Sequence, residues 1–358
     1  MNNGEFEDYL RSKAAAINSK LAEYLVKESS DRYVGRLLGR AGHKYHHESL
    51  SKAIFEPAWY LIGLGGKRWR STLMALTIEA LGKDSDYYAE FCMVPEIIHN
   101  ATLIHDDIED GSVTRRAAPA VHIKYGIDIA TNLGDFMFYF PVVALLDSKK
   151  LSIKTKNKFL SIYVREMLRA TTGQATDLAW HNFLVNPASI EEENYLQMVY
   201  DKTGVLARMA CKLGGVLCET DDATIEALGN FGATIGVAFQ IQDDLLNLYP
   251  SRVSETKGGV GEDITEGKIS LPVIYALQHS KQKDRKKLLE ILKMHTTNQK
   301  LKGEAIGIID ASGAKTYCEY VEHKIVKEAW ARVNKKLPKS EAKDRLEMMA
   351  HFLIDRSR

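Results

Sequence analysis

Residues 91–110 read FCMVPEIIHNATLIHDDIED. The part from Phe91 to Ile104 is apolar on nearly every side of a helix, which predicts a helix inside a helical assembly rather than on its surface. The stretch then ends in carboxylates, where Asp106 and Asp110 stand four residues apart. In a helix this spacing places both side chains on one face, about 6 Å apart along the axis.

A second apolar run, FQIQDDLLNL at 239–248, ends in the same way with Asp243 and Asp244. Several carboxylates in one cavity repel each other and raise their own pKa values unless cations neutralise them. Oxygen ligands from few residues suit Mg²⁺ that is shared with a phosphorylated substrate. One such motif alone is more often a solvated acidic surface, but two motifs that each end an apolar helix favour a metal site.

The composition limits the partners of the protein. The chain has 358 residues, a net charge of +1 and 45% hydrophobic residues. This balance gives no reason to expect a nucleic acid or an anionic membrane as the main partner. The four cysteines are scattered without a CxxC pair, which argues against zinc and disulfides and fits a cytoplasmic protein. The N-terminus MNNGEFEDYL has early acidic residues and no apolar core, so it is not expected to be a signal peptide.

Helical periodicity dominates the chain and strand signals are nearly absent. We therefore expect an all-α protein: a helical extension over residues 1–60, packed on one continuous domain over residues 61–358. A capping box is expected from Ser189 and Glu192, and a solvated loop over Asp147–Lys158. The expected helices are Glu7–Glu28, Ser71–Leu81, Tyr87–His105, Ile129–Leu146, Lys158–Arg169, Ser189–Leu217, Thr224–Leu246, Leu271–His279 and Tyr317–Asn334. The apolar run 129–146 contains polar residues and a proline, so we expect a buried helix and no stable membrane insertion.

Basic residues accompany the carboxylates. We call Asp106–Asp110 the first aspartate cluster and Asp243–Asp244 the second. Arg115 and Arg116 follow the first cluster, and a basic group, Lys67, Arg68 and Arg70, follows a Gly-Gly turn. Arginine offers a planar fork for phosphate oxygens, while lysine is a mobile point charge. This combination predicts a polyanionic ligand bound partly through metal and partly directly. The histidines at 43, 46 and 47 lie in a connector that contains Gly and Tyr, and they are interpreted as structural or exposed.

Six motifs occur in an order and spacing that resemble the trans-type isoprenyl (polyprenyl) diphosphate synthases. They are GGKRWR, HNATLIHDDIEDGSVTRR, GQATD, DKTG, FQIQDDLLN and KGGVGEDITEGK, within residues 60 to 275. The resemblance implies an all-α bundle around a central catalytic cavity, usually a homodimer. It also implies Mg²⁺-dependent condensation of isopentenyl diphosphate with an allylic diphosphate, with three Mg²⁺ per active site and Mn²⁺ as a possible substitute.

The same resemblance assigns the site residues. Metal binding falls to Asp106, Asp110 and Asp243, supported by Asp107 and Asp244. Contacts to the allylic diphosphate fall to Arg115, Lys202, Lys257, Gln174, Asp177 and Lys268. The isopentenyl diphosphate pocket corresponds to Lys67, Arg70, His99 and Arg116. Lys202, Thr203 and Gln240 join the three metal-binding aspartates as catalytic residues.

Product length is expected to depend on the residues below the first cluster. Small Ala101 and Thr102 leave the cavity open to longer chains, and Phe138 and Tyr139 correspond to an aromatic floor in geranylgeranyl diphosphate synthases. We therefore expect a twenty-carbon product. A longer polyprenyl product is the first alternative, because a small residue such as Ala101 is also typical of long-chain enzymes. A class I terpene cyclase and a non-catalytic subunit are weaker alternatives, because both aspartate clusters and the isopentenyl residues are present.

Overall fold

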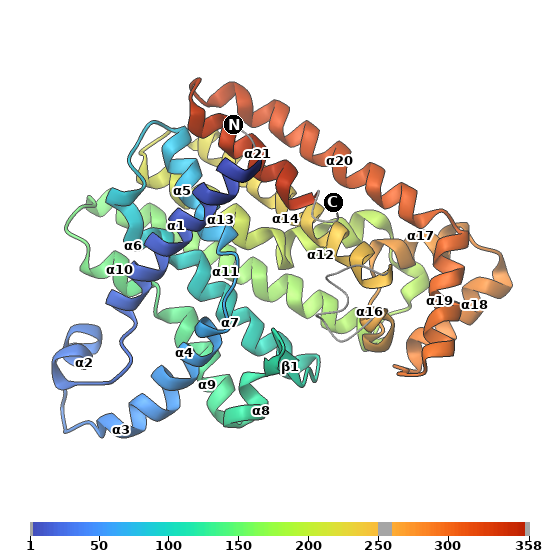
Figure 1. The fold of residues 1–358 in the computed structure, drawn as a ribbon, viewed down its shortest axis with the longest axis horizontal. Coiled ribbons are helices and arrows are strands. Elements are labelled where there is room, and N and C mark those ends of the chain that lie inside the picture. Colours follow the sequence, from blue (N-terminus) through green and yellow to red (C-terminus); the bar gives the residue numbers. More distant parts are fainter. Residues whose placement is uncertain (1–2, 250–259, 355–358) are drawn as a thin grey trace. The chain divides into compact units, whose positions relative to one another are not determined.

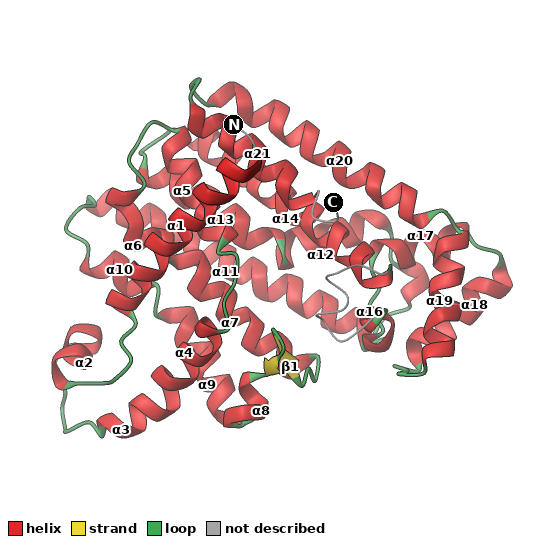
Figure 2. Ribbon diagram, viewed as in Figure 1, coloured by secondary structure: helices red, strands yellow, loops and turns green. Residues whose placement is uncertain are grey.

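The computed structural model describes residues 3–249 and 260–354. Helices make up nearly all of the regular secondary structure of this part, and a hairpin of two short strands is the exception (Figure 2). The strands, β1 (Thr114–Arg115) and β2 (Ala118–Pro119), pair antiparallel. The expected all-α class is confirmed. The helices form two compact units, residues 1–160 with 216–219, and residues 161–215 with 220–358.

The first unit is built around α7, which carries the first aspartate cluster (Figure 1). Residues Ile97, Ile98, Ala101 and Ile104 of α7 are at most 1% exposed, and the helix packs on α9 and α5. Its elements are α1 (Asn3–Tyr24), α2 (Asp31–Leu38), α3 (His47–Leu50), η1 (Ser51–Phe55), α4 (Glu56–Gly63), α5 (Trp69–Ala80), η2 (Asp86–Tyr88), α6 (Ala89–Cys92), α7 (Val94–Glu109), α8 (Val121–Tyr125), α9 (Ile127–Tyr139) and α10 (Val142–Asp147).

The second unit is built around α14, which carries the second cluster and packs along α20. Asp221 caps α14 by accepting a hydrogen bond from the backbone N–H of Thr224, as an N-cap aspartate should. The elements are α11 (Ile153–His181, which begins in the first unit), η3 (Pro187–Ser189), α12 (Glu192–Lys202), α13 (Gly204–Leu217), α14 (Asp222–Leu248), α16 (Glu262–Glu266), α17 (Leu271–His279), α18 (Gln282–Lys293), α19 (Gln299–Ala311), α20 (Ala314–Val333), η4 (Asn334–Lys336) and α21 (Glu341–Ile354).

The N-terminal helix α1 packs on α5 and α6. Its apolar stripe buries Phe6, Ile17 and Leu21, each at most 3% exposed. Lys13 fastens the same helix through an ion pair of 2.8 Å to Glu79 of α5. The first sixty residues therefore contribute to the core of the first unit.

Several expected helix boundaries are wrong. The run Ser189–Leu217 is not one helix, because the chain turns at Thr203 and continues as α13. The capping box lies at Glu191 and Asn194 instead of Ser189 and Glu192, since Ser189 belongs to a short 3-10 turn. The expected loop over Asp147–Lys158 ends early, because α11 begins at Ile153.

The run expected as one helix over Ile129–Leu146 is divided at Phe140–Pro141 into α9 and α10, since proline cannot donate a helical hydrogen bond. By length and composition alone, Ile127–Asp147 could cross a membrane, and 44% of its apolar window is buried inside the protein. Core helices pass the same test, so this segment is weak evidence for a membrane span.

Candidate active site

The first cluster divides into two kinds of aspartate. Helical hydrogen bonding continues to the end of α7, where the Asp110 N–H donates to the carbonyl of Asp106 over 2.8 Å. Asp106 and Asp110 therefore share one face of the helix. Asp107 points elsewhere and is 1% exposed. Both of its oxygens accept hydrogen bonds from Nε of Arg115, at 2.9 and 3.2 Å.

Arg115 reaches Asp107 because the β1–β2 hairpin folds back over the end of α7. Burial raises the pKa of Asp107, and the hydrogen bond and charge of Arg115 oppose that rise. The sequence assigned Arg115 to a diphosphate contact and Asp107 to a supporting role. In the structure the two form an ion pair that anchors the hairpin.

Basic residues gather around His99, two turns before Asp106 on α7. Burial lowers the pKa of His99 well below its usual value, and Arg70, Arg116, Arg115 and Arg68 add to the effect in that order. Four guanidinium groups therefore lie close enough to act on one imidazole. Of the residues expected at the isopentenyl pocket, His99, Arg70 and Arg116 come together, and Lys67 is exposed on the loop before α5.

The second cluster divides in the same way. Asp244 is 4% exposed. Its Oδ2 accepts a hydrogen bond from the hydroxyl of Tyr195 at 2.6 Å, and its Oδ1 accepts one from Nε2 of Gln240 at 2.8 Å. Burial raises the pKa of Asp244 to about 6, with these two hydrogen bonds opposing the rise. Asp243 precedes it on α14 and is half-buried.

Gln240 links this cluster to the DKTG motif. The hydroxyl of Thr203 donates to Oε1 of Gln240 over 2.9 Å, and Gln240 in turn donates to Asp244. Thr203 stands at the C-terminal end of α12, directly after Lys202. The structure therefore joins two motifs that the sequence separates by more than thirty residues.

Lys202 and the GQATD motif also meet. The ammonium of Lys202 lies 2.5 Å from Oδ2 of Asp177. Burial opposes ionisation of Asp177, but Lys202 and Lys268 outweigh it and hold the pKa of Asp177 below its usual value. Gln174 lies one turn earlier on α11, half-buried. Helices α11 and α12 approach closely because Gly173 has no side chain: a Cβ there would lie 2.4 Å from the backbone nitrogen of Lys202.

Asn247 fastens the start of α16 to α14. Its side-chain oxygen accepts a hydrogen bond from the backbone N–H of Asp263 at 3.1 Å, and its carbonyl accepts one from Gly261 at 2.7 Å. Lys268 follows α16 and pairs with Glu266 and, at 3.6 Å, with Asp263. The expected diphosphate contact Lys257 lies outside the described residues.

The residues expected to set product length lie on α7 and α9. Ala101 is fully buried, and the hydroxyl of Thr102 donates to the carbonyl of His99 at 2.9 Å. Phe138 is half-buried and stacks on His105 with ring centroids 5.2 Å apart. Tyr139, next to it, is 78% exposed in the single chain.

Three residues outside the expected site are closely tied to it: Tyr195, Glu96 and Arg68. Glu96 is an isolated acid inside the apolar run 91–104, and Arg68 stands inside the basic group after the glycines. Both residues are buried, with exposures of 3% for Glu96 and 4% for Arg68. This burial distinguishes them from other charged residues, and it cannot be predicted from the sequence pattern. Tyr195 carries no such signal, since its partner is forty-nine residues away.

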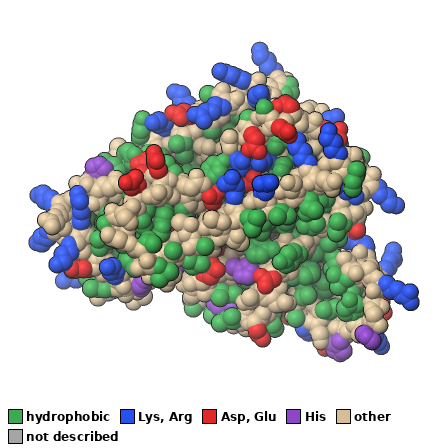
Figure 3. Space-filling view, turned by 180° about the vertical axis from the view of Figure 1, so that it is seen from behind, with side chains coloured by type: hydrophobic (Ala, Val, Ile, Leu, Met, Phe, Trp, Pro, Cys, Tyr) green, Lys and Arg blue, Asp and Glu red, His purple; other side chains and the backbone are tan. Residues whose placement is uncertain are grey.

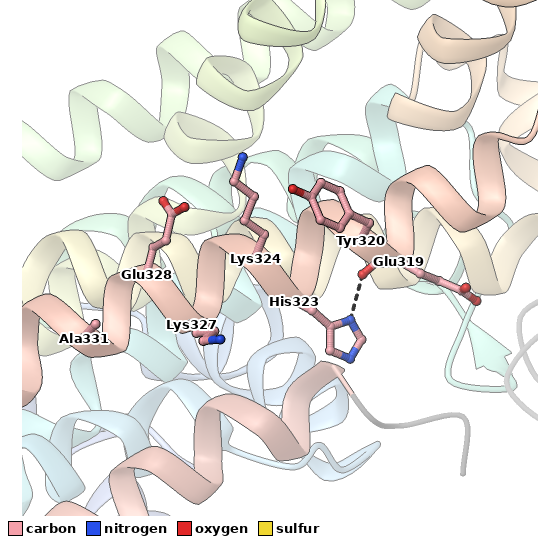
Figure 4. Close-up of a pocket in the computed structure, with 7 residues that line it drawn as sticks. All are labelled: Glu319, Tyr320, His323, Lys324, Lys327, Glu328 and Ala331. Atoms are coloured by element: carbon pink, nitrogen blue, oxygen red, sulfur yellow. Dashed lines mark hydrogen bonds between the residues drawn. The ribbon is translucent and has the colours of Figure 1, made fainter.

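One surface hollow of about 700 Å³ lies apart from these motifs (Figure 4). Its seven lining residues, all from α20, are Glu319, Tyr320, His323, Lys324, Lys327, Glu328 and Ala331. One hydrogen bond, between His323 and the carbonyl of Glu319, joins them, as drawn in Figure 4. Groups from a single helix do not converge on a ligand, so this hollow is not a candidate for catalysis.

Comparison with known proteins identifies the family. Residues 51–309 match the polyprenyl synthetase family, and the chain belongs to it. The chain is 36% identical over 308 residues to a short chain isoprenyl diphosphate synthase from Methanothermobacter thermautotrophicus. The aligned region covers 85% of this chain and 91% of that protein. The resemblance predicted from the motifs is confirmed: this is an enzyme that transfers prenyl groups.

Solved structures agree with this assignment. A geranylgeranyl pyrophosphate synthetase from Pyrococcus horikoshii superposes with a TM-score of 0.83 at 29% identity, over 99% of this chain and 100% of that one. A polyprenyl synthase from Caulobacter crescentus, complexed with calcium and isoprenyl diphosphate, superposes with a TM-score of 0.81 over 100% and 98% of the two chains. At 24% identity the latter likeness concerns the fold alone.

Proposed function

We propose that the chain is a Mg²⁺-dependent synthase that joins isopentenyl diphosphate to an allylic diphosphate and forms geranylgeranyl diphosphate. The observation that carries the proposal is the arrangement on α7. One face of this helix presents His99 among arginines and, two turns later, Asp106 and Asp110. Cationic groups and hard oxygen ligands side by side are what two diphosphate substrates require from a protein.

The donor set fits Mg²⁺. Asp106, Asp110 and Asp243 are half-buried carboxylates. Both oxygens of Asp107 and of Asp244 accept hydrogen bonds within the protein. Among the residues that the structure describes, no three His, Cys, Asp or Glu side chains form a group that could hold an ion. Mg²⁺ needs only one or two carboxylates when substrate phosphates complete its coordination.

We assign the metal to Asp106, Asp110 and Asp243, with three ions per site and Mn²⁺ able to replace Mg²⁺. When bound, the metal would neutralise negative charge on the departing diphosphate. Asp107 fastens the hairpin to the end of α7, and Asp244 fastens α12 to α14.

Direct contacts to the two diphosphates come from basic side chains. For the allylic diphosphate we assign Arg115, Lys202, Lys257 and Lys268, with Gln174 and Asp177 orienting the lysines. For isopentenyl diphosphate we assign Lys67, Arg70, His99 and Arg116. Burial and the neighbouring arginines lower the pKa of His99, and a neutral imidazole can donate one hydrogen bond to a phosphate oxygen.

The reaction begins when the allylic C1–O bond breaks, and its electron pair leaves with the diphosphate. The double bond of isopentenyl diphosphate then supplies the electrons for a new bond to C1. The resulting cation loses a proton to the released diphosphate, which restores a double bond. Basic side chains fixed before the reaction stabilise the leaving diphosphate without reorganisation. Lys202, Thr203 and Gln240 provide fixed dipoles and charge beside the reacting carbons.

The product is assigned from α7 and α9. Small, buried Ala101 leaves room for a chain beyond fifteen carbons, and Phe138, stacked on His105, stands as a floor. A longer polyprenyl product is the second candidate, because the small side chain of Ala101 does not block further growth of the prenyl chain.

The proposed partner in assembly is a second copy of the chain. Val164 and Leu168, one turn apart on α11, are 49% and 63% exposed. Hydrophobic side chains form patches bordered by charged ones on the face drawn in Figure 3. Contiguous apolar residues on one helix face mark an interface more often than a free surface. We propose a cytoplasmic homodimer without nucleic acid or stable membrane insertion.

The test is an assay of the purified protein with Mg²⁺ and farnesyl diphosphate, with and without isopentenyl diphosphate. Formation of geranylgeranyl diphosphate only when both substrates are present supports the proposal. A cyclic hydrocarbon formed without isopentenyl diphosphate would identify a terpene cyclase. No product with dimethylallyl, geranyl or farnesyl diphosphate would point to a non-catalytic subunit.

A further inference from the structure

Arg68 is buried between two residues assigned to isopentenyl diphosphate, Lys67 and Arg70. Its side chain is 3% exposed and faces Glu96, which is equally buried. The guanidinium donates to four acceptors: Oε1 of Glu96 at 2.6 Å, Oδ1 of Asn18 at 3.1 Å, and the carbonyls of Ile62 at 3.0 Å and Gly65 at 3.4 Å. Only the planar fork of arginine can donate in so many directions at once.

The backbone of Arg68 is in an unusual conformation. With φ 51° and ψ 26° it lies in the left-handed region, which is disfavoured for residues that carry a side chain. Its carbonyl accepts hydrogen bonds from the N–H and the hydroxyl of Thr72, both at 3.0 Å, and so begins α5. The bonds of the side chain hold this conformation, and with it the turn that carries Lys67 and Arg70.

The turn before Arg68 is enclosed by two arginines. A terminal nitrogen of Arg116 donates to the carbonyl of Gly65. A Cβ at Gly66, where φ is 144°, would lie 3.1 Å from nitrogens of both Arg68 and Arg116. The position of Arg116 therefore depends on the same turn that Arg68 fixes.

Glu96 connects this turn to α7. Its Oε1 accepts from Arg68 and also, at 2.9 Å, from the side-chain amide of Asn100, which is fully buried. His99 is the neighbour of Asn100 on the same helix. The ion pair of Arg68 and Glu96 thus fastens the loop before α5 to the part of α7 that carries His99.

We propose that Arg68 and Glu96 are positioning residues for isopentenyl diphosphate: their buried ion pair holds Lys67, Arg70 and Arg116 in the arrangement that binds the diphosphate. This inference rests on the proposed function. Asn18 extends the support to α1, a helix outside the residues that match the family. The N-terminal helix α1 therefore supports the binding of isopentenyl diphosphate indirectly, through Asn18 and Arg68, without contacting the substrate.

The test compares the KM values of the two substrates in Arg68→Lys and Glu96→Gln. Arg68→Lys keeps the charge but loses the fork, and Glu96→Gln keeps the shape but loses the charge. We expect the KM for isopentenyl diphosphate to rise about tenfold, the effect of one charge-assisted hydrogen bond. The KM for farnesyl diphosphate should stay within about twofold. Asn18→Ala, which removes one partly exposed acceptor, should raise the first KM about twofold to threefold.

Two further variants separate positioning from stability. Glu79→Gln weakens the contact between α1 and α5 through Lys13, away from the loop, and should lower the melting temperature with neither KM changed. Arg68→Gly suits the left-handed backbone but removes every side-chain bond, so it should raise the KM for isopentenyl diphosphate as much as Arg68→Lys or more. An unchanged KM in Arg68→Gly would overturn the inference.

The other possible results also distinguish a positioning role from a purely structural one. If both KM values rise together in Arg68→Lys, or if Glu79→Gln reproduces the effect, the ion pair has only a structural role and the inference is wrong. If Arg68→Lys fails to fold, the KM values for isopentenyl diphosphate of Asn18→Ala and Glu79→Gln test the inference instead. Equal values in these two variants would show that the inference is wrong. If the wild-type protein forms no product from the two substrates, the proposed function fails first and the inference fails with it.

Discussion

Tyr195 donates its hydroxyl hydrogen to Oδ2 of Asp244 over 2.6 Å, and both side chains are buried. Tyr195 lies on α12 and Asp244 on α14, so one hydrogen bond joins the helix that ends at Lys202 to the helix that carries the second cluster. Burial raises the pKa of Tyr195 well above its usual value, and Asp244 adds to the effect. The hydroxyl therefore stays protonated and can only donate to this carboxylate.

We predict that Tyr195→Phe lowers the free energy of unfolding by about 1–3 kcal/mol, because it leaves one oxygen of a buried carboxylate unsatisfied. Denaturant unfolding measures the loss. Tyr317→Phe is the matched control, since it removes a similar bond of 2.5 Å to Glu192 that is only partly buried. Its loss should be smaller, and equal losses in the two variants would contradict the assignment of Tyr195 as an anchor.

The close approach of α11 and α12 can be tested at Gly173. A methyl group there meets the backbone of Lys202 at 2.4 Å, so Gly173→Ala should destabilise the protein by about 1–3 kcal/mol and reduce activity. Gly303→Ala on α19 is the control, because nothing lies within 4 Å of its Cβ position. There alanine should stabilise by about 0.5–1 kcal/mol. Thermal melting and kcat/KM of both variants check the prediction.

The pair of Asp177 and Lys202 predicts a pH dependence. The pKa of Asp177 is lowered in the folded state, so its contribution to stability is present above the unfolded value of about 4 and is lost as the pH falls through the folded value. Asp177→Asn should therefore cost about 1–3 kcal/mol at pH 7. The difference from wild type should shrink below about pH 4. A difference that stays constant from pH 7 to pH 3 would show that the charge of Asp177 is not responsible.

Neighbouring aspartates should behave differently. We predict that Asp106→Asn reduces kcat/KM at least about a hundredfold with little change in stability, because it removes a metal ligand. Asp107→Asn should instead lower the free energy of unfolding by about 1–3 kcal/mol, because Arg115 loses its charged partner. Chelation of Mg²⁺ with EDTA should abolish activity in the wild type, and added Mg²⁺ should restore it. Equal stability loss in the two variants would refute this division of roles.

Product length should respond to α7 and α9. Ala101→Phe should shorten the product, because the added ring takes up room that the proposed product chain needs below Asp106. Ala101 is fully buried, so the larger side chain should also cost about 1–3 kcal/mol of stability. Phe138→Ala should lengthen the product, because it removes the ring proposed as the floor. Chromatography of the products formed from farnesyl and isopentenyl diphosphate measures both effects. An unchanged distribution in both variants would rule out this floor.

The sequence was sufficient for the fold class and the family. Helical periodicity and the clusters around Asp106 and Asp243 are local patterns, because residues three or four apart in a helix share a face whatever the helix packs against. The ends of helices were harder to predict. The turn at Thr203 divides an apolar run that looks continuous, and the helix from Ile153 begins within a segment that reads as polar loop.

The tertiary structure decided which groups the supporting aspartates contact. The motifs already assigned Asp107 and Asp244 to supporting roles, and the structure supplies their partners, Arg115 and Tyr195, which donate hydrogen bonds to their oxygens. It likewise paired Arg68 with Glu96, twenty-eight residues away. The physical reason is that a buried polar group must find a partner, and packing, not position in the chain, determines which group that partner is.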